Sequence, residues 1–488
     1  MAKLILCMTI LSFTMISTLQ APSLTQAKQV NVFSSLNSLI TEDPILEGAI
    51  AGVSIRSASN GQVLYSYNGD VSLTPASNLK LFTAASALDS LGPDYSYQTE
   101  LFTDGKVRRN EIKGNVYIVG HGDPTLRVKD IESMAKTLKK QGIQSITGDI
   151  IADDSWYDDI RYSVDLPWSD ETAYYGAQIS ALTISPDKDF DAGTVIIEVS
   201  PGNKNQQAEL SVFPNTNFVT LVNKTQTVST DEKSELTISR IHGKNEIIVE
   251  GTISEKASPV KEWVAVWDPT SYSLSVLKKA LEQQGIKVKG KERKGAKPHD
   301  SKMLLSHQSI PLKEILIPFM KNSNNTHAEM LIKEMGKLHK QNGSWEAGLD
   351  VEKQTLISLG MDVEKMILRD GSGISHVNAI QANSITDLLY KSQSKSWFPS
   401  FYDSLPVAGI KEKNIGGTLR NRMTEKPLKE NVVAKTGTLT NVSSISGYLT
   451  LSDGNKLIFS ILMNHLKNED QGKLLEEKIL SLIAQSTL

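Results

Sequence analysis

The sequence has little cysteine, little net charge and no long apolar run after its first residues. The single cysteine, Cys7, lies in an N-terminal apolar segment, so the remaining chain offers no disulfide, thiol nucleophile or cysteine-ligated zinc. The formal net charge of −3 argues against a nucleic-acid-binding protein, which usually has a strong positive balance. The eight histidines show no paired ligand spacing, so neither a metal nor a cofactor is expected.

The N-terminal segment has the pattern of a secretory signal peptide. Lys3 supplies a positive charge, residues 4–19 are apolar apart from small hydroxyl residues, and Thr25-Gln26-Ala27 offers small residues for cleavage. An uncleaved membrane anchor is the alternative, but the apolar run is shorter than the roughly 20 residues that a spanning helix needs. We therefore expect residues 1–27 to be removed and the protein to work in the cell envelope, outside the cytoplasmic membrane.

The two ends of the chain have similar predicted secondary structure, with β-strands followed by a helix. Near the front, Asn60-Gly61 separates two alternating runs, which predicts a β-hairpin, and a helix with an apolar stripe follows Pro75. Near the back, three strands are predicted before a final helix; they cover residues 432–439, 442–450 and 456–463. This similarity predicts one domain, assembled from residues 28–94 and 296–488.

The middle of the chain differs. A chain of 488 residues is too long for one core, and two to four domains are expected. Residues 95–180 and 265–295 alternate strand and helix patterns, whereas residues 181–264 have a mostly β pattern. We predict two nested insert domains there. The basic stretch 289–300 is interpreted as a solvated linker in preference to a wall-binding patch.

Ser77 and Lys80 form a candidate nucleophile and base. Three residues apart on a helix, they lie on one face, and a desolvated lysine can take the serine proton. The spacing alone is weak evidence, because five other serines share it. Only Ser77 follows a hairpin and opens an apolar-striped helix; the others are Ser133, Ser185, Ser258, Ser275 and Ser392.

Two further motifs follow in order. Ser323 and Asn325 precede a helical pattern and could relay a proton and hold a substrate amide, although such residues are also ordinary helix caps. Lys435-Thr436-Gly437 lies on a predicted strand, where Lys and Thr can bind a carboxylate and Gly lets a backbone approach. A plain strand with a bulge glycine is the alternative for this second motif.

Together the three motifs form the set found in class A β-lactamases and penicillin-binding proteins, with Asn324 where the set has Asp. Two further segments, Gly-His-Gly-Asp-Pro-Thr-Leu at residues 120–126 and Asp-Gly-Ser-Gly-Ile-Ser at residues 370–375, are similar to sequence signatures of one family within this group. The sequence resembles the class C low-molecular-mass penicillin-binding proteins, the D-alanyl-D-alanine carboxypeptidase/endopeptidase family. The resemblance implies an α+β multidomain fold whose catalytic domain, an antiparallel sheet flanked by helices, is split by the inserts.

The resemblance also implies a mechanism. Ser77 would attack the D-Ala-D-Ala bond of peptidoglycan stem peptides, with Lys80 as base, and backbone N–H groups of Ser77 and Thr438 would hold the oxyanion. Ser323 and Lys435 would pass a proton to the departing D-alanine, whose carboxylate Lys435, Thr436 and Thr438 would bind. β-Lactams would acylate the same serine, and cross-link endopeptidase activity is left open.

A side-chain pocket is a further implication of the resemblance. Trp156 and Asp159 look like contributors to a diaminopimelate pocket, whereas His376 stands where relatives often have Arg. Other functions on the same scaffold are a β-lactamase, a D-amino-acid esterase, or a non-catalytic β-lactam sensor. Deacylation separates the enzymes, because a β-lactamase releases penicillin quickly and a carboxypeptidase stays acylated. Failure to release D-alanine from a D-Ala-D-Ala peptide would favour the sensor.

Overall fold

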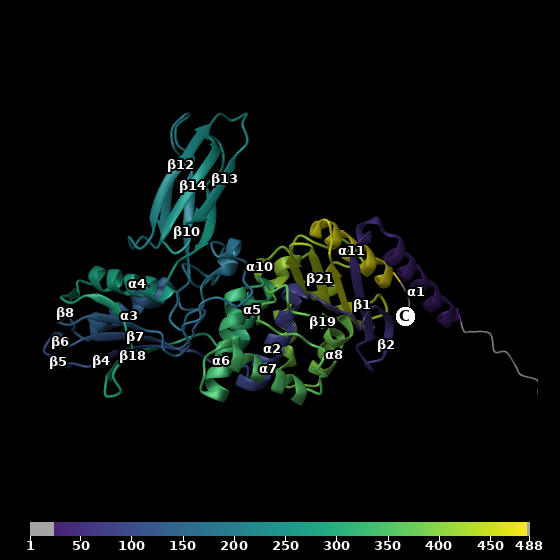
Figure 1. Ribbon diagram of the computed structural model, residues 1–488, viewed down its shortest axis with the longest axis horizontal. Helices are drawn as coiled ribbons and strands as arrows, with labels where there is room; N and C mark the ends of the chain where they lie inside the picture. The colour runs from purple at the N-terminus through teal and green to yellow at the C-terminus, as the bar shows by residue number, and fades with distance from the viewer. Residues whose placement is uncertain (1–23, 486–488) are drawn as a thin grey trace, which may run out of the picture.

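The computed structural model describes residues 24–485, so Cys7 and most of the predicted signal peptide lie outside the described part. The molecule is elongated, with a helix-and-sheet lobe formed by both chain ends, a second α/β lobe, and a β-rich arm that projects from the second lobe (Figure 1). Within residues 24–485, no helix is both long and apolar enough to cross a bilayer.

The first lobe is built on a five-stranded antiparallel sheet in the order β2-β1-β22-β21-β20. β1 (Ile50–Ser57) pairs with both β2 (Val63–Tyr67) and β22, so the predicted hairpin is confirmed and lies beside the C-terminal strands. The remaining strands are β20 (Val432–Leu439), β21 (Val442–Thr450) and β22 (Lys456–Asn464). A shared sheet explains why the two ends of the sequence look alike.

Helices cover both faces of this sheet. Because side chains alternate between faces along a strand, Ile461 packs with α1 (Leu24–Glu42) and α11 (Glu469–Ala484), whereas Leu462 belongs to the larger core on the other side. That larger core is helical; it includes α2 (Lys80–Leu91), α5 (Leu312–Lys321), α6 (Asn325–Lys340), α7 (Trp345–Ser358), α8 (Ala382–Ser392) and α9 (Phe398–Ser404). The short helix α10 (Lys413–Gly416) and the two-residue strands β3 (Ser72–Leu73) and β19 (Ile380–Gln381) complete this lobe.

The second lobe contains two sheets and two helices. One sheet has the order β17-β9-β7-β4-β18 and the other β16-β8-β6-β5. Helices α3 (Val128–Lys140) and α4 (Pro269–Gln283) pack on them. The strands are β4 (Gln98–Thr103), β5 (Lys106–Arg108), β6 (Glu111–Lys113), β7 (Val116–Gly120), β8 (Ser145–Ile146), β9 (Ile150–Asp153), β16 (Lys287–Val288), β17 (Glu292–Lys294) and β18 (Lys302–Gln308).

Two details differ from the sequence-based expectation for this lobe. β18 pairs with β4, so the sheet continues to Gln308, beyond the boundary predicted at residue 296. The basic stretch 289–300 is not a linker, because β17 within it pairs in parallel with β9. Few apolar residues are needed for an edge strand whose partner strand supplies the buried side chains.

The arm consists almost entirely of strands. One sheet has the order β11-β10-β15 and the other β12-β14-β13, in agreement with the mostly β pattern of residues 181–264. The strands are β10 (Thr194–Ser200), β11 (Glu209–Phe213), β12 (Thr220–Val228), β13 (Glu235–Arg240), β14 (Glu246–Ser254) and β15 (Val260–Ala265). Residues 186–193 come just before β10, and Asp189 within them pairs with Lys413 of α10.

Candidate active site

Ser77 lies in a tight 3₁₀ turn, Ala76–Leu79, immediately before α2. The α-helix therefore begins at Lys80, later than the Pro75 start that the sequence predicts. Ala76 has a positive φ of 47°, and a Cβ on Gly373 (φ 83°) would collide with its carbonyl oxygen. The glycine of the 370–375 segment thus allows the nucleophile turn to pack against that segment.

Lys80 is fully buried and makes three polar contacts through Nζ. It lies 2.9 Å from Ser77 Oγ, 2.7 Å from Asn325 Oδ1 and 2.8 Å from the Ser372 carbonyl oxygen. Burial lowers the pKa of Lys80 to about 7, and the negative charges of Glu329 and Asp370 oppose that shift. The amine can therefore be neutral near physiological pH, with the serine hydroxyl within reach.

A buried carboxylate supports the backbone that contacts Lys80. Glu329, on α6, accepts hydrogen bonds from the backbone N–H groups of Gly371 (2.9 Å) and Ser372 (2.8 Å), and from the indole N–H of Trp345 (2.7 Å). The two backbone donors fix the segment that presents the Ser372 carbonyl oxygen to Lys80, and the Trp345 indole holds the carboxylate to which they bind.

The Ser323–Asn325 motif is both a helix cap and part of the site. Asn324 is the N-cap of α6, and its side-chain oxygen accepts the His327 backbone N–H at 3.1 Å. Ser323, just before it, has a left-handed φ of 59°. Asn325 contacts Lys80 through its oxygen and donates through Nδ2 to the Tyr175 carbonyl oxygen at 3.0 Å. The two interpretations of this motif are therefore compatible.

The third motif lies on β20. Lys435 is fully buried, and its Nζ donates to Ser323 Oγ at 2.8 Å and to the Thr436 carbonyl oxygen at 2.6 Å. Burial, and then the charge of Lys80, lower the pKa of Lys435 well below its usual range. A Cβ on Gly437 would lie 2.8 Å from the Ser77 backbone nitrogen, so glycine is required where β20 passes the nucleophile.

These residues border a cavity of about 430 Å³. Lys80, Lys435 and Gly437 do not line the cavity but lie behind its wall. Two of the lining residues, Thr418 and Thr436, contact each other through their hydroxyl oxygens at 2.7 Å. The cavity is lined by Ser77, Pro167, Ser169, Asp170, Tyr174, Tyr175, Asn322, Ser323, Asn325, Ile374, His376, Thr418, Thr436, Thr438, Leu439 and Thr440.

Trp156 and Asp159 are not among the lining residues, contrary to the expectation. The Trp156 indole N–H donates at 3.0 Å to Glu334, a buried carboxylate that also accepts from the Tyr157 hydroxyl, and the indole ring packs on His121. The Asp159 side chain is fully exposed. A buried carboxylate needs donors, and this need directs Trp156 away from the cavity.

The sequence reasoning missed the residues that take their place. Asp170, Tyr174 and Tyr175 come from the segment after Trp168, and Thr418 comes from a short turn near α10. None of these four residues belongs to a sequence motif that indicates a catalytic or binding role. The aromatic pair beside an acidic residue, in Asp170 to Tyr175, was the only available signal.

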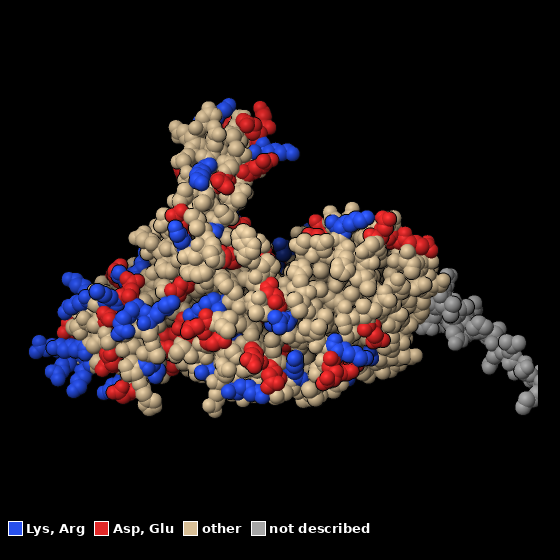
Figure 2. Space-filling model, viewed as in Figure 1, with Lys and Arg blue, Asp and Glu red and all other residues tan. Residues whose placement is uncertain are grey.

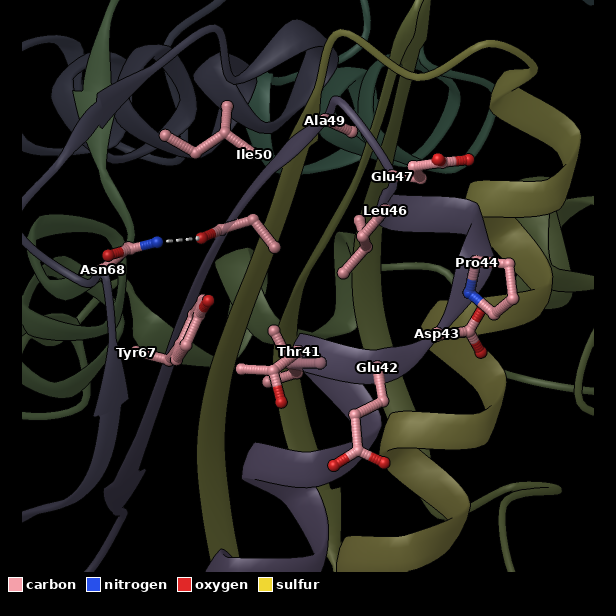
Figure 3. A pocket seen from close by; sticks show the side chains of 12 residues that line it. Thr41, Glu42, Asp43, Pro44, Leu46, Glu47, Ala49, Ile50, Tyr67 and Asn68 are labelled. Atoms are coloured by element: carbon pink, nitrogen blue, oxygen red, sulfur yellow. Dashed lines mark hydrogen bonds between the residues drawn. The ribbon is translucent and has the colours of Figure 1, made fainter.

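A second cavity, of about 470 Å³, lies at the end of α1, where the chain enters β1 (Figure 3). Its wall contains Glu42, Asp43 and Glu47, and Asn68 closes one side by donating to the Ala51 carbonyl oxygen. No residue of the three motifs lines it, and no side chain in it is paired as Ser77 is with Lys80. Of these two cavities, only the first is lined by residues of the three motifs.

The chain is similar to known proteins over most of its length. The model of the D-Ala-D-Ala carboxypeptidase 3 (S13) family matches residues 33–485. A D-alanyl-D-alanine carboxypeptidase of an Actinomadura species is 40% identical over 430 residues, which is 87% of this chain and 79% of that protein. The D-alanyl-D-alanine carboxypeptidase DacB of Haemophilus influenzae is 27% identical over 445 residues, 90% of each chain.

Solved structures agree with these matches. The crystal structure of penicillin-binding protein 4 (DacB) from Haemophilus influenzae has a TM-score of 0.80 and 26% identity, over 93% of this chain and 98% of that one. A second crystal structure of that protein, complexed with a β-lactam, has a TM-score of 0.74 with the same coverage. The predicted penicillin-binding fold is thus confirmed.

Proposed function

Because the chain belongs to the D-Ala-D-Ala carboxypeptidase 3 (S13) family, and is a serine-type D-Ala-D-Ala carboxypeptidase, we propose that Ser77 is the residue that its substrate acylates. The observation that carries this proposal is the contact of Ser77 Oγ with Lys80 Nζ, 2.9 Å away and fully buried. Serine is a weak nucleophile without a base in reach, and a desolvated amine with a pKa of about 7 is such a base.

In the acylation step, Lys80 takes the Ser77 proton while Ser77 Oγ attacks the carbonyl carbon between the two D-alanines. The developing negative charge on the carbonyl oxygen is stabilised by the backbone N–H groups of Ser77 and Thr438. Each such donor contributes roughly 3–4 kcal/mol to lowering a barrier of this type. The glycine at position 437 supports this assignment, because a side chain there would crowd the Ser77 backbone nitrogen: its Cβ would lie 2.8 Å away.

Departure of D-alanine needs a proton on its nitrogen. Ser323 Oγ, 2.8 Å from Lys435 Nζ, is the group we assign to deliver it. Throughout this step, Thr436 and Thr438 hold the terminal carboxylate, with the Lys435 amine directly behind them, and Asn325 binds the peptide amide. Water later hydrolyses the ester at Ser77 and releases the shortened peptide. A β-lactam forms the same ester, but its amine stays attached and blocks the water.

The substrate side chain before D-Ala-D-Ala would lie against the wall formed by Asp170, Tyr174 and Tyr175. Asp170 is the one carboxylate of that wall, so it suits a side chain that ends in an ammonium group, such as the diamino acid of a stem peptide. His376, from the 370–376 segment, also lines the cavity. These residues replace Trp156 and Asp159 in the proposal.

Carboxypeptidase action is favoured over the β-lactamase and esterase alternatives. The two carboxylates whose charges act on Lys80, Glu329 and Asp370, are both buried and use their oxygens on backbone N–H groups, so neither is placed to activate a deacylating water. Asp170, the one carboxylate in the cavity wall, is assigned here to the substrate side chain. A long-lived acyl-enzyme with β-lactams follows from this arrangement.

We propose that the mature protein works outside the cytoplasmic membrane after loss of residues 1–27, in contact with an anionic surface of the envelope. Residues 98–153 and 269–308 contain 18 Lys and Arg but 11 Asp and Glu, although the whole chain has a net charge of −3. Figure 2 shows Lys and Arg gathered at the end of the second lobe where Figure 1 labels β5, β6 and β8. Exposed members of this group are Lys106, Arg108, Arg109, Lys113, Lys136, Lys139, Lys140, Lys287, Lys289 and Lys291.

Binding to such a surface would be electrostatic and therefore sensitive to salt. Co-sedimentation with vesicles that contain an anionic phospholipid should fall as salt rises, and should fall again when Lys287, Lys289 and Lys291 are changed to Gln. Equal binding to uncharged vesicles would contradict the proposal.

We also propose a division of the chain that follows its sheets. The catalytic domain would comprise residues 28–94 and 309–488, the α/β insert residues 95–180 and 265–308, and the nested β insert residues 181–264. The shift of one boundary from 296 to 309 rests on the pairing of β18 with β4.

The central test uses a labelled penicillin and a peptide that ends in D-Ala-D-Ala. The Ser77→Ala variant should lose both covalent labelling and release of D-alanine. Ser133→Ala is the matched control, because Ser133 has the same spacing to a lysine but is exposed on α3. Labelling that survives in Ser77→Ala would refute the proposed nucleophile.

A further inference from the structure

A turn that precedes the β-rich arm contacts the catalytic lobe at the Ser323 motif. The carbonyl oxygen of Phe190 lies 3.0 Å from Asn324 Nδ2 and 3.0 Å from His327 Nε2. Asp191 Oδ1 lies 3.1 Å from the same Asn324 nitrogen. A segment more than 130 residues earlier in the chain thus supplies two acceptors to the residue next to Ser323.

Ser323 needs such support. Its left-handed φ of 59° costs energy for a residue with a Cβ and persists only where the surroundings hold it. The next residue, Asn324, makes three hydrogen bonds. Its backbone N–H donates to the Phe319 carbonyl oxygen, its side-chain oxygen accepts from the His327 backbone N–H, and its side-chain nitrogen donates to the turn. The position of Ser323 therefore depends on how Asn324 is bound.

The turn is itself anchored to three parts of the molecule. Lys413, on α10, lies 2.6 Å from Asp189, and the Arg127 guanidinium lies over the Phe190 ring at 5.4 Å. The Thr194 hydroxyl, at the start of β10, donates to the Asp191 carbonyl oxygen at 2.7 Å. The acceptors offered to Asn324 are consequently fixed in place before any substrate binds.

We propose that Asp191 is a positioning residue for catalysis, which acts on Ser323 through Asn324. This inference rests on the proton-delivering role proposed for Ser323. It also gives a reason for the amide at position 324, where the resembling motif has a carboxylate. An amide can accept from His327 and donate to Phe190 and Asp191 at the same time, whereas an ionised carboxylate can only accept.

The charge around Asp191 makes a second carboxylate unfavourable. Burial, together with the nearby charges of Asp189 and Asp187, raises the pKa of Asp191 to about 7, and Lys413 opposes this shift. His327 offers no compensation, because burial lowers its pKa to about 4 and leaves it neutral. An aspartate at position 324 would therefore place a further acceptor against Asp191 and a carbonyl oxygen, in a position that now holds a donor.

The test is a double-mutant cycle between the two positions. Asn324→Asp should lower kcat for D-alanine release by at least about tenfold, the effect of losing a buried hydrogen bond to a charged partner, with a smaller change in KM. Asp191→Asn should partly restore kcat when combined with Asn324→Asp, because the amide introduced at position 191 can donate to the new carboxylate. Effects that simply add, with no recovery in the double variant, would overturn the proposal.

Two further variants keep the outcome clear. Asp191→Ala removes the acceptor and should lower kcat more than Asp191→Asn, which retains an oxygen. Equal losses in these two variants would count against the proposal, and this comparison can be made even if Asn324→Asp does not fold. Thermal unfolding and circular dichroism identify misfolded variants. Ser323→Ala separates the two levels: unchanged kcat in it refutes the role of Ser323, whereas a loss there with full activity in Asn324→Asp refutes only the role of Asp191.

Discussion

Lys80 and Lys435 are both fully buried, and each contacts a different serine of one cavity: Lys80 reaches Ser77 at 2.9 Å and Lys435 reaches Ser323 at 2.8 Å. The charge of Lys80 is one cause of the lowered pKa of Lys435. Two buried ammonium groups so placed disfavour each other. A state in which only one of the two amines is charged is therefore favoured, and Lys80 can act as the base when it is the neutral one.

This relationship predicts the pH dependence of acylation. Lys80 accepts a proton only when neutral, so the second-order rate of labelling by penicillin should rise with pH up to about 7 and level off above it. Below the pKa the neutral fraction falls tenfold per pH unit. Stopped-flow or quenched labelling between pH 5 and 9 measures this limb, and a limb near the ordinary pKa of lysine would contradict it.

A substitution at Glu329 tests the direction in which nearby charge shifts the pKa of Lys80. Its negative charge raises the pKa of Lys80, so Glu329→Gln should move the same limb to lower pH. Thermal unfolding must accompany the measurement, because the variant replaces an acceptor of the Trp345 and Gly371 N–H groups. A limb that moves to higher pH would show that the charge of Glu329 does not act on Lys80.

A methyl group at position 437 should block the oxyanion site. In Gly437→Ala, the new Cβ would lie 2.8 Å from the Ser77 backbone nitrogen, so β20 or the 3₁₀ turn must shift. Loss of one oxyanion donor costs about 10²–10³ in rate, and we expect such a drop in penicillin labelling. Gly295→Ala, whose Cβ would have no contact closer than 3.4 Å, is the matched control and should label normally.

Asp170 should select the substrate side chain. Replacing it with Asn removes the carboxylate of the cavity wall without changing its size. KM for a D-Ala-D-Ala peptide whose preceding side chain ends in an ammonium group should rise by about tenfold, since one charge-assisted contact contributes about 1.5–3 kcal/mol. The N-acetylated form of the same peptide should show no such change; equal effects on both peptides would argue against this contact.

Thr418 should act on substrate binding through Thr436. The Thr418→Val variant keeps the shape but removes the hydroxyl that lies 2.7 Å from Thr436 Oγ1. Loss of one neutral hydrogen bond, about 1 kcal/mol, should raise KM several-fold and leave the pH limb of acylation in place. A shifted limb would instead connect Thr418 to the proton chemistry, and this outcome would contradict the prediction.

Much of this site could be predicted because its motifs combine local rules. Asn60-Gly61, the stripe after Pro75 and the strands around Lys435 each follow from turn chemistry or periodicity. What periodicity does not predict is the backbone conformation at the nucleophile. The left-handed Ala76 is compatible with the turn because Gly373, almost 300 residues away, leaves room for its carbonyl oxygen.

The side-chain pocket shows the opposite case. Trp156 and Asp159 resemble pocket residues in type and approximate position, but a buried carboxylate on α6, Glu334, engages Trp156 instead. Residues that do line the cavity, such as Asp170 and Tyr175, belong to an irregular segment with no periodic pattern. Their location depends on contacts between lobes, and these contacts leave no mark on the local sequence.

The turn at Phe190 and Asp191 also bears on protein engineering. A shortened enzyme, made by joining residue 94 directly to residue 309, would keep all three motifs and the whole five-stranded sheet. It would nevertheless lack the oxygens that bind Asn324 and His327, and the Tyr175 carbonyl oxygen that binds Asn325. Such a truncation would leave unpaired donors beside the reacting groups, so the catalytic lobe is not a detachable module and any library of trimmed variants should retain residues 170–194.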